Sequence, residues 1–366
     1  MAKISIVTSF FSETIEMVER LYVNVKKCNV NWEWIVTNDF SNNSDLEDKL
    51  TRISNQDVRV RKITQKTKLE IFRNPSLYSE GDFIFVIDGD DVFNPVYLEH
   101  ALVWFKRFPE VICIISGCRW VSDTGHVLKY HIDSPFETPH EKAGGFSLCH
   151  NYTGRIWRNT HQIDWTEIFK IPENIIRMSD HFIVEYLSTK GDILHLPRIY
   201  IDYEVKKNSN SRIDRTKEEL HIIETTYQEF WDWRRAQKPQ FSRFPYFFSG
   251  ETEFQRELQP FLKISWDITK GVMGVIGFSR IPAKRKMLSQ LYPEFTLLFD
   301  PSPHDSENID FYVLCDIDKM EYEIPIKKWF THFEGEDKKE IIFSFLRKYS
   351  NLYWTNTEGN FWVERI

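Results

Sequence analysis

Hydrophobic and polar positions alternate along the first hundred residues in blocks that predict strands and helices in turn. Apolar positions recur at helical spacing in residues 13–27, 44–53 and 95–108. Between them lie short apolar runs that predict strands at residues 4–7, 34–36, 58–61, 83–87 and 111–116. Repeated strand–helix–strand units of this kind form an open, mostly parallel sheet flanked by helices. The pattern therefore predicts an α/β fold for this part of the chain.

Polar turns follow three of the predicted strands, after Val7, Val36 and Ile87. In parallel sheets, ligands bind in the crevice at the carboxyl ends of the strands. We therefore expect the three turns to line one crevice, although they are far apart in sequence.

The pattern changes after residue 116. Residues 117–200 are less regular, with a helix expected at 179–190, and residues 206–215 are polar enough to be a loop or linker. Beyond residue 216 we expect helices and strands of a second, smaller α/β domain, with helices at 220–235 and 341–349 and strands at 272–278, 295–299 and 309–315. The predicted domains are residues 1–215 and residues 216–366. We expect the second domain to bind the acceptor or a partner, and we assign no role to its individual residues.

The predicted helix at 44–53 has a recognisable start. Ser44 is a candidate N-cap, and Glu47, three residues later, would complete a capping box.

Composition narrows the class of protein. The net charge of −7 and pI of about 5.9 argue against a protein that coats nucleic acid. The five cysteines are odd in number and widely spaced, which predicts reduced thiols rather than disulfides or a zinc site. We find no signal peptide and no apolar run long enough to span a membrane. We therefore expect a cytoplasmic protein without a transmembrane segment.

The strongest chemical signal is Asp88-Gly89-Asp90-Asp91, directly after the most hydrophobic predicted strand. Three carboxylates this close repel one another unless a cation is present. Oxygen ligands suit Mn²⁺ or Mg²⁺, and Mg²⁺ commonly binds one or two carboxylates together with substrate phosphates. The alternative is an acidic turn whose aspartates cap the next helix.

Three further residues are candidates with simpler alternatives. Asp39 can accept a hydrogen bond from a nucleobase, or can form a local turn. Arg73 can pair with phosphate, or can be a solvated surface residue. Asp180 can act as a general base if it faces the crevice, or can interact only with the dipole at the start of its helix.

These segments, in this order, resemble the family 2 glycosyltransferases of the GT-A fold over about residues 3–211. The opening strand and the strand ending in Asn38-Asp39 are similar to the family's first two strands, and Arg73-Asn74 matches its "ARN" segment. Residues 83–95 match its strand and acidic motif, Ser179-Asp180 lies where the family has Glu-Asp, and residues 203–211 are similar to a conserved loop.

The resemblance implies a role for each matching residue. Thr8, Ser9 and Phe10 would border the nucleoside, and Asp39 would contact the base. Asp88 would lie near the ribose, Asp90 would bind Mn²⁺ or Mg²⁺, and Asp91 would support that metal site. Asp180 would be the general base of an inverting displacement. The remaining candidate donor-binding residues are Asn38, Arg73, Lys206 and Arg212.

Three departures from the family affect this expectation. Asn38 replaces a usual Asp, and Ser179 replaces Glu. Lys206 replaces a usual His, so the last metal ligand is left open, although a lysine can still pair with a diphosphate.

The expected partner is a nucleotide-sugar donor, which the resemblance suggests is UDP-linked. The acceptor is left open between a glycan and a hydroxymethylated base in DNA, which the basic clusters around Arg212 and Arg285 would suit. A different class, a non-catalytic nucleotide-sugar or glycan binding protein, predicts donor binding without turnover. A nucleotidyltransferase is disfavoured, because the chain lacks a glycine-rich loop for a triphosphate.

Overall fold

The computed structural model describes two compact units. The first comprises Met1–His195 and Tyr200–Phe248, and the second Leu196–Ile199 and Ser249–Ile366. The described residues are 2–39, 41–66, 70–122, 124–131, 153–161, 163–165, 190–205, 270–315, 328–334, 352–357 and 360–365, with isolated positions between 183 and 268. The boundary expected between residues 215 and 216 stays a prediction.

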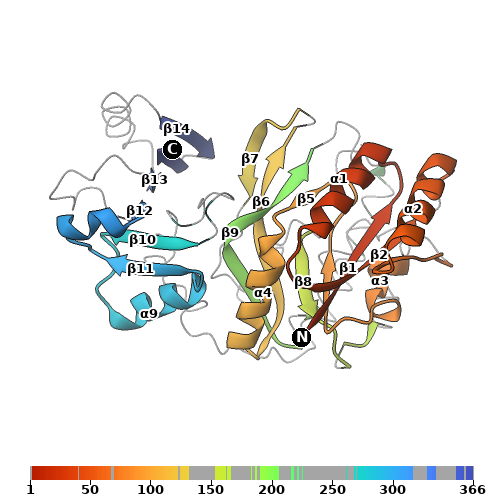
Figure 1. Ribbon diagram of the computed structural model, residues 1–366, viewed down its shortest axis with the longest axis horizontal. Helices are drawn as coiled ribbons and strands as arrows, with labels where there is room; N and C mark the ends of the chain where they lie inside the picture. The colour runs from red at the N-terminus through yellow and green to blue at the C-terminus, as the bar shows by residue number, and fades with distance from the viewer. Residues whose placement is uncertain are drawn as a thin grey trace. The chain divides into compact units, whose positions relative to one another are not determined.

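The first unit is built on a mixed sheet (Figure 1). Four of the five predicted strands lie in its parallel part, and the fifth, at 111–116, lies in its antiparallel part. The strand order is β3-β2-β1-β4-β8-β6-β9-β5, and β7 pairs with β6. The strands β3, β2, β1 and β4 run parallel, and β8 joins β4 in the antiparallel direction. The strands are β1 (Lys3–Phe10), β2 (Asn31–Asn38), β3 (Val60–Lys62), β4 (Phe83–Val86), β5 (Val92–Phe93), β6 (Val111–Val121), β7 (Val127–His131), β8 (Arg155–Arg158) and β9 (Asp192–Glu204).

Three helices of the first unit lie where their spacing predicted them. They are α1 (Ile15–Lys26), α2 (Ser44–Gln56) and α4 (Val96–Arg107). The buried residues of α1 and α2 recur three or four positions apart, which lets one face of each helix pack on the sheet. Two short helical turns, α3 (Glu70–Arg73) and η1 (Pro75–Leu77), lead into β4. The GT-A-like α/β fold expected for this region is confirmed.

The start of α2 differs from the prediction. The N-cap is Asn43, whose side chain accepts hydrogen bonds from the amides of Asp45 and Leu46. Ser44 is the first helical residue, and the Glu47 carboxylate bonds to Asn38 and Lys62 instead of closing a capping box. Asn and Ser cap helices about equally well, so sequence alone could not choose between neighbouring candidates.

This cap gives a direct test. Asn43→Ala is expected to cost about 1 kcal/mol of stability, because two amides of the first turn lose their acceptor. Ser44→Ala is the control and should leave the thermal midpoint nearly unchanged. Equal losses in both variants would contradict the cap assignment. The measurement is thermal unfolding followed by circular dichroism.

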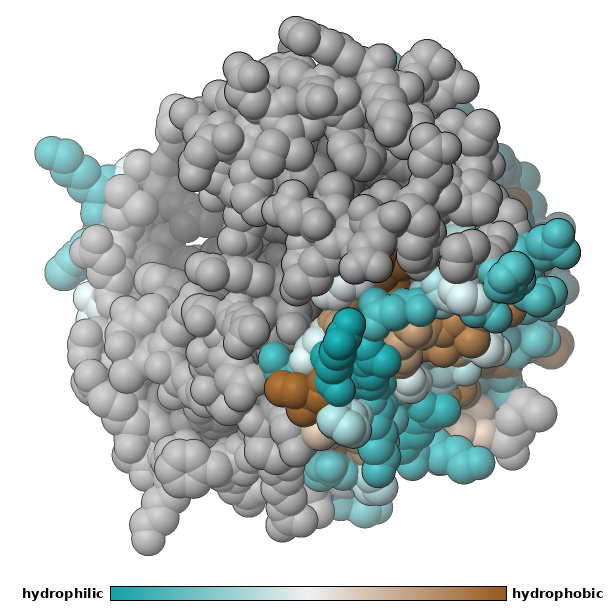
Figure 2. Space-filling view, turned by 90° about the vertical axis from the view of Figure 1, so that its left-hand side faces the viewer, coloured by the Kyte–Doolittle hydropathy of each residue, from teal (hydrophilic) through white to brown (hydrophobic). Residues whose placement is uncertain are grey.

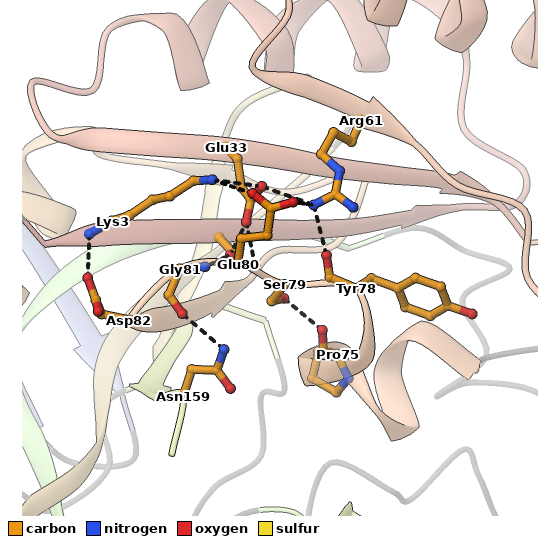
Figure 3. A network of polar contacts seen from close by, with 11 residues as sticks. Lys3, Glu33, Arg61, Pro75, Tyr78, Ser79, Glu80, Gly81, Asp82 and Asn159 are labelled. Atoms are coloured by element: carbon orange, nitrogen blue, oxygen red, sulfur yellow. Dashed lines mark hydrogen bonds and ion pairs between the residues drawn. The ribbon is translucent and has the colours of Figure 1, made fainter. Parts of the chain in front are cut away.

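A polar network joins the amino ends of the parallel strands (Figure 3). At its centre the buried Glu33 of β2 accepts hydrogen bonds from Ser5 Oγ at 2.5 Å and from the backbone amide of Glu80 at 2.7 Å. Its other oxygen pairs with Lys3 at 3.1 Å and Arg61 at 3.2 Å. The network lies at the sheet edge opposite the predicted crevice, so its role is to hold β1, β2, β3 and the segment before β4 together.

The second unit contains a smaller sheet, as expected. Its order is β11-β10-β12-β13-β15-β14, in which the first four strands are parallel and β15 pairs antiparallel with both β13 and β14. The strands are β10 (Gly271–Ile276), β11 (Phe295–Phe299), β12 (Phe311–Leu314), β13 (Lys328–Glu334), β14 (Leu352–Thr357) and β15 (Asn360–Arg365).

The helical elements described in the second unit are not the ones that the sequence predicted. The helix α9 (Pro282–Leu291) joins β10 to β11, and η6 (Pro303–Asn308) precedes β12. The pattern did not predict α9, although Pro282 near its start is a typical signal. The helices expected at 179–190, 220–235 and 341–349 lie largely or wholly outside the described residues.

Among the coloured residues on the face in Figure 2, hydrophilic ones predominate and hydrophobic ones form smaller areas. Within the described part of the chain, no helix is both long and apolar enough to cross a membrane.

Four described cysteines carry thiols rather than disulfides, and burial raises the pKa of Cys28 and of Cys113 to about 12.

Candidate active site

The three polar turns lie side by side because their strands are neighbours in the sheet order β2-β1-β4. The amide of Asp39, after β2, donates to the carbonyl of Phe10 at 2.7 Å. The amide of Ile87, after β4, donates to the carbonyl of Val7 at 3.1 Å. The predicted convergence of these segments at one edge of the sheet is confirmed.

The Asp88–Asp91 turn is held in place mainly through its backbone. The amide of Asp88 donates to the hydroxyl of the buried Thr153 at 3.1 Å. Gly89 packs so closely on Phe10 that a Cβ there would lie 2.5 Å from the ring. Asp88 and Asp90 are half-buried, so the turn presents two of its three carboxylates near the surface.

Asp91 differs from the other two aspartates because it is 1% exposed. One carboxylate oxygen accepts the backbone amide of Glu204 at 2.9 Å, and the other, Oδ2, has no hydrogen bond within the described residues. Burial raises the pKa of Asp91 well above its ordinary value, and the neighbouring Asp90 and Asp88 raise it further. The geometry therefore makes Asp91 an internal support of the turn that carries Asp90.

The residues of β1 predicted to border the nucleoside are largely enclosed. The Thr8 hydroxyl accepts a hydrogen bond from the Trp34 indole at 3.0 Å, and Phe10 is fully buried with its ring edge-on to Trp34. Ser9 is 9% exposed, and its hydroxyl has no hydrogen-bond partner within the described residues. Among these three, Ser9 has an uncommitted polar atom for a ligand, whereas Thr8 and Phe10 shape the sheet edge.

The turn after β2 uses Asn38 as a structural residue. Its side-chain oxygen accepts from the amide and hydroxyl of Ser41 at 3.0 and 2.6 Å, and its nitrogen donates to Glu47 at 3.2 Å. This local turn is the alternative that the sequence offered for Asp39, formed instead by the preceding residue.

Asp39 is buried and connects the same turn to the segment before β4. It accepts a hydrogen bond from Gln65 at 3.0 Å, and Gln65 in turn accepts the amide of Ile71 in α3 at 2.7 Å. The orientation of the Asp39 carboxylate therefore depends on residues some thirty positions away.

Four predicted site residues are not placed by the structure. The side chain of Arg73, at the end of α3, lies outside the described part, as do the whole of Asp180, Lys206 and Arg212. Their assigned roles stay predictions.

Several residues around the turns were not found from the sequence. These are Arg20, Gln65, Thr153 and Arg155, the last a fully buried arginine on β8 opposite Val86 of β4. The sequence gives little signal for the burial of Arg155, because β8 reads Arg155-Ile156-Trp157-Arg158 and a charged side chain is rarely buried unless paired.

The site suits a hard divalent cation in its donor chemistry. The turn gathers three carboxylates, and one buried carboxylate oxygen of Asp91 has no hydrogen-bond partner within the described residues. The described residues contain no group of three or more His, Cys, Asp or Glu side chains arranged to hold a metal on their own. A cation here would need ligands from the donor in addition to Asp90.

The strand order of the first sheet and this acidic turn at the carboxyl end of a buried strand form a GT-A-like arrangement. Residues 5–163 match the family described as Glycosyl transferase family 2. No curated protein matched the chain.

Solved structures that match this chain include two of TarS from S. aureus. The complex of its residues 1–349 with UDP-GlcNAc is 14% identical, with 71% of each chain covered and a TM-score of 0.48. The complex with UDP is 16% identical, covers 71% of this chain and 86% of the other, and has a TM-score of 0.44.

Proposed function

We propose that this chain is a metal-dependent, inverting glycosyltransferase that moves a sugar from a UDP-linked donor to an acceptor hydroxyl. The observation that carries the proposal is the meeting of three turns at the ends of β1, β2 and β4, with the Asp88–Asp91 carboxylates among them. The match of residues 5–163 to the Glycosyl transferase family 2 supports sugar transfer as the reaction.

Mn²⁺ or Mg²⁺ fits the charge of this turn. Asp90 would hold the ion, with Asp91 supporting the turn from inside and Asp88 directed to the ribose. The bound ion would act as a Lewis acid that stabilises negative charge on the diphosphate leaving group. The other donor contacts are assigned to Ser9, Asp39, Arg73, Lys206 and Arg212, with Thr8, Phe10 and Asn38 shaping the pocket wall.

The reaction is a single in-line displacement. The acceptor oxygen attacks the anomeric carbon while the bond from that carbon to the diphosphate oxygen breaks, which inverts the configuration. Asp180 accepts the proton of the acceptor hydroxyl as the general base. Lys206 would pair with the diphosphate as a point charge.

The test of this proposal is donor hydrolysis without acceptor. The purified chain would be incubated with a panel of UDP-, GDP- and CDP-linked sugars, each with Mn²⁺, with Mg²⁺ and with a chelator. We expect slow release of nucleoside diphosphate from one UDP-linked donor, abolished by the chelator. Calorimetry with the same panel measures binding separately, because a strict acceptor requirement would suppress hydrolysis. No metal-dependent binding of any donor would overturn the proposal, whereas binding that no acceptor converts into turnover would indicate a non-catalytic binding protein.

The acceptor class can be separated by a second experiment. A glycan acceptor predicts no retardation of duplex DNA in a gel at low salt. A hydroxymethylated base predicts retardation that weakens steeply as salt rises, because DNA binding releases counterions.

A further inference from the structure

Arg20 of α1 contacts the backbone of the acidic turn. Its guanidinium donates to the carbonyl oxygen of Asp90 at 2.5 Å and to the carboxylate of Glu204 at 3.0 Å. One helix turn further, the Asn24 side chain donates to the carbonyl of Phe93. One face of α1 therefore holds both ends of the segment that begins with Asp90.

Glu204 contacts both Arg20 and the acidic turn. Its carboxylate is 9% exposed and pairs with Arg20, while its backbone amide donates to Asp91. The turn is thus fixed at two successive residues, at the Asp90 carbonyl by Arg20 and at the Asp91 carboxylate by the end of β9. In sequence, Glu204 is two residues before Lys206.

We infer that Arg20 is a positioning residue for metal binding, which fixes the peptide of Asp90 so that its carboxylate is directed toward the cation and the donor diphosphate. The inference rests on the proposed metal-dependent function. A residue that orients a ligand typically changes metal affinity by about 10–100-fold when it is removed. Arg20 touches neither the cation nor the donor in this assignment, so it acts through the orientation of the Asp90 carboxylate.

The space around Arg20 makes it suitable for substitution. It lines an open groove of about 450 Å³ with residues of α1 and β5, and its side chain is 42% exposed. Water can therefore fill the volume that a smaller side chain leaves, and no dry core cavity results.

The chain also supplies a matched control. Arg61 bridges a buried glutamate, Glu33, and a backbone carbonyl, that of Tyr78 at 3.1 Å, and its side chain is 39% exposed. It also pairs with the carboxylate of Glu80 at 2.8 Å, so it makes both kinds of contact that Arg20 makes and one further ion pair. Figure 3 shows these contacts of Arg61. A purely structural role for Arg20 predicts that Arg20→Ala and Arg61→Ala behave alike.

The experiment titrates Mn²⁺ into the full chain in the presence of UDP by calorimetry, with the thermal midpoint measured in parallel without metal. We expect Arg20→Ala to raise the half-saturating Mn²⁺ concentration about 10-fold. Arg61→Ala should leave it within about 2-fold of wild type, with a loss of thermal midpoint at least as large as that of Arg20→Ala. Arg20→Lys, which keeps the charge and most of the volume, should fall between wild type and Arg20→Ala.

The possible outcomes distinguish the positioning role of Arg20 from the proposed metal-dependent function. If wild type binds Mn²⁺ and UDP together but Arg20→Ala and Arg20→Lys titrate like Arg61→Ala, the positioning role is overturned and the proposed function stands. If wild type shows no metal-dependent binding of UDP or any donor, the proposed function is overturned, and the positioning role with it. Should Arg20→Ala fail to fold, the shift in Arg20→Lys relative to Arg61→Ala decides the question.

Discussion

Asp90→Asn is expected to reduce metal-dependent release of nucleoside diphosphate by at least about 100-fold. The substitution keeps the shape of the side chain and removes the charge that the proposed cation needs. The carbonyl of residue 90 still accepts from Arg20, so the fold of the turn should be preserved. The measurement is the initial rate at saturating Mn²⁺, together with Mn²⁺ affinity by calorimetry.

Asp48→Asn is the control for this substitution. Asp48 is an exposed residue of α2, and the same change of charge there should leave both rate and affinity unchanged. Full activity in Asp90→Asn would remove Asp90 from the metal site and favour the alternative in which the acidic turn is only a structural feature. Equal loss in both variants would indicate a non-specific effect of charge.

Glu33→Gln is expected to have the largest effect on stability, about 3 kcal/mol. The carboxylate of Glu33 is 3% exposed and receives four donors, from Ser5, Glu80, Lys3 and Arg61. An amide in its place presents hydrogens to at least one of these donors and leaves a buried polar group unsatisfied. Glu47→Gln is the matched control, since Glu47 also forms an ion pair but its side chain is 44% exposed, and such surface pairs contribute less than about 1 kcal/mol.

The stabilisation by Glu33 should also depend on pH. Burial by itself would raise the pKa of Glu33, but the hydrogen bonds from Ser5, the Glu80 amide and Lys3 outweigh burial and lower the pKa from its ordinary 4.5. A lowered pKa stabilises the fold fully above the unfolded value and loses this effect as pH falls through the folded value. The difference in thermal midpoint between wild type and Glu33→Gln should therefore be full at pH 7 and shrink below pH 4.5. A difference that stayed constant to lower pH would contradict an ionised Glu33 as the stabilising species.

The features that could be predicted from the sequence are those determined by residues close together in the chain. The strand before Asp88 and the acidic turn after it lie within a single short segment, and the helical spacing of α1 and α4 is equally local. The neighbourhood of the three turns also followed from general rules for parallel sheets, without any contact having to be identified.

What could not be predicted depends on contacts between distant segments. Nothing in the sequence near Arg20 indicates a carbonyl 70 positions later or a glutamate 184 positions later. The strand β9 contains Pro197, and β8 begins with the buried Arg155, so neither shows the plain apolar pattern of β4. The N-cap of α2 could not be chosen from the sequence either, because Asn and Ser have similar N-cap preferences and occupy adjacent positions, 43 and 44.

The attachment of the acidic turn to Glu204 has a consequence for the order in which the protein forms during synthesis. The hydrogen bond from Glu204 to Asp91 closes a loop of 113 residues, and long-range contacts of this kind form late in folding because the entropy of loop closure must be overcome first. A nascent chain that has emerged only as far as β8 would contain every aspartate of the turn but lack the support at Asp91. The proposed metal binding would therefore be acquired only after the ribosome has released β9, well after the parallel strands β1 to β4 are complete.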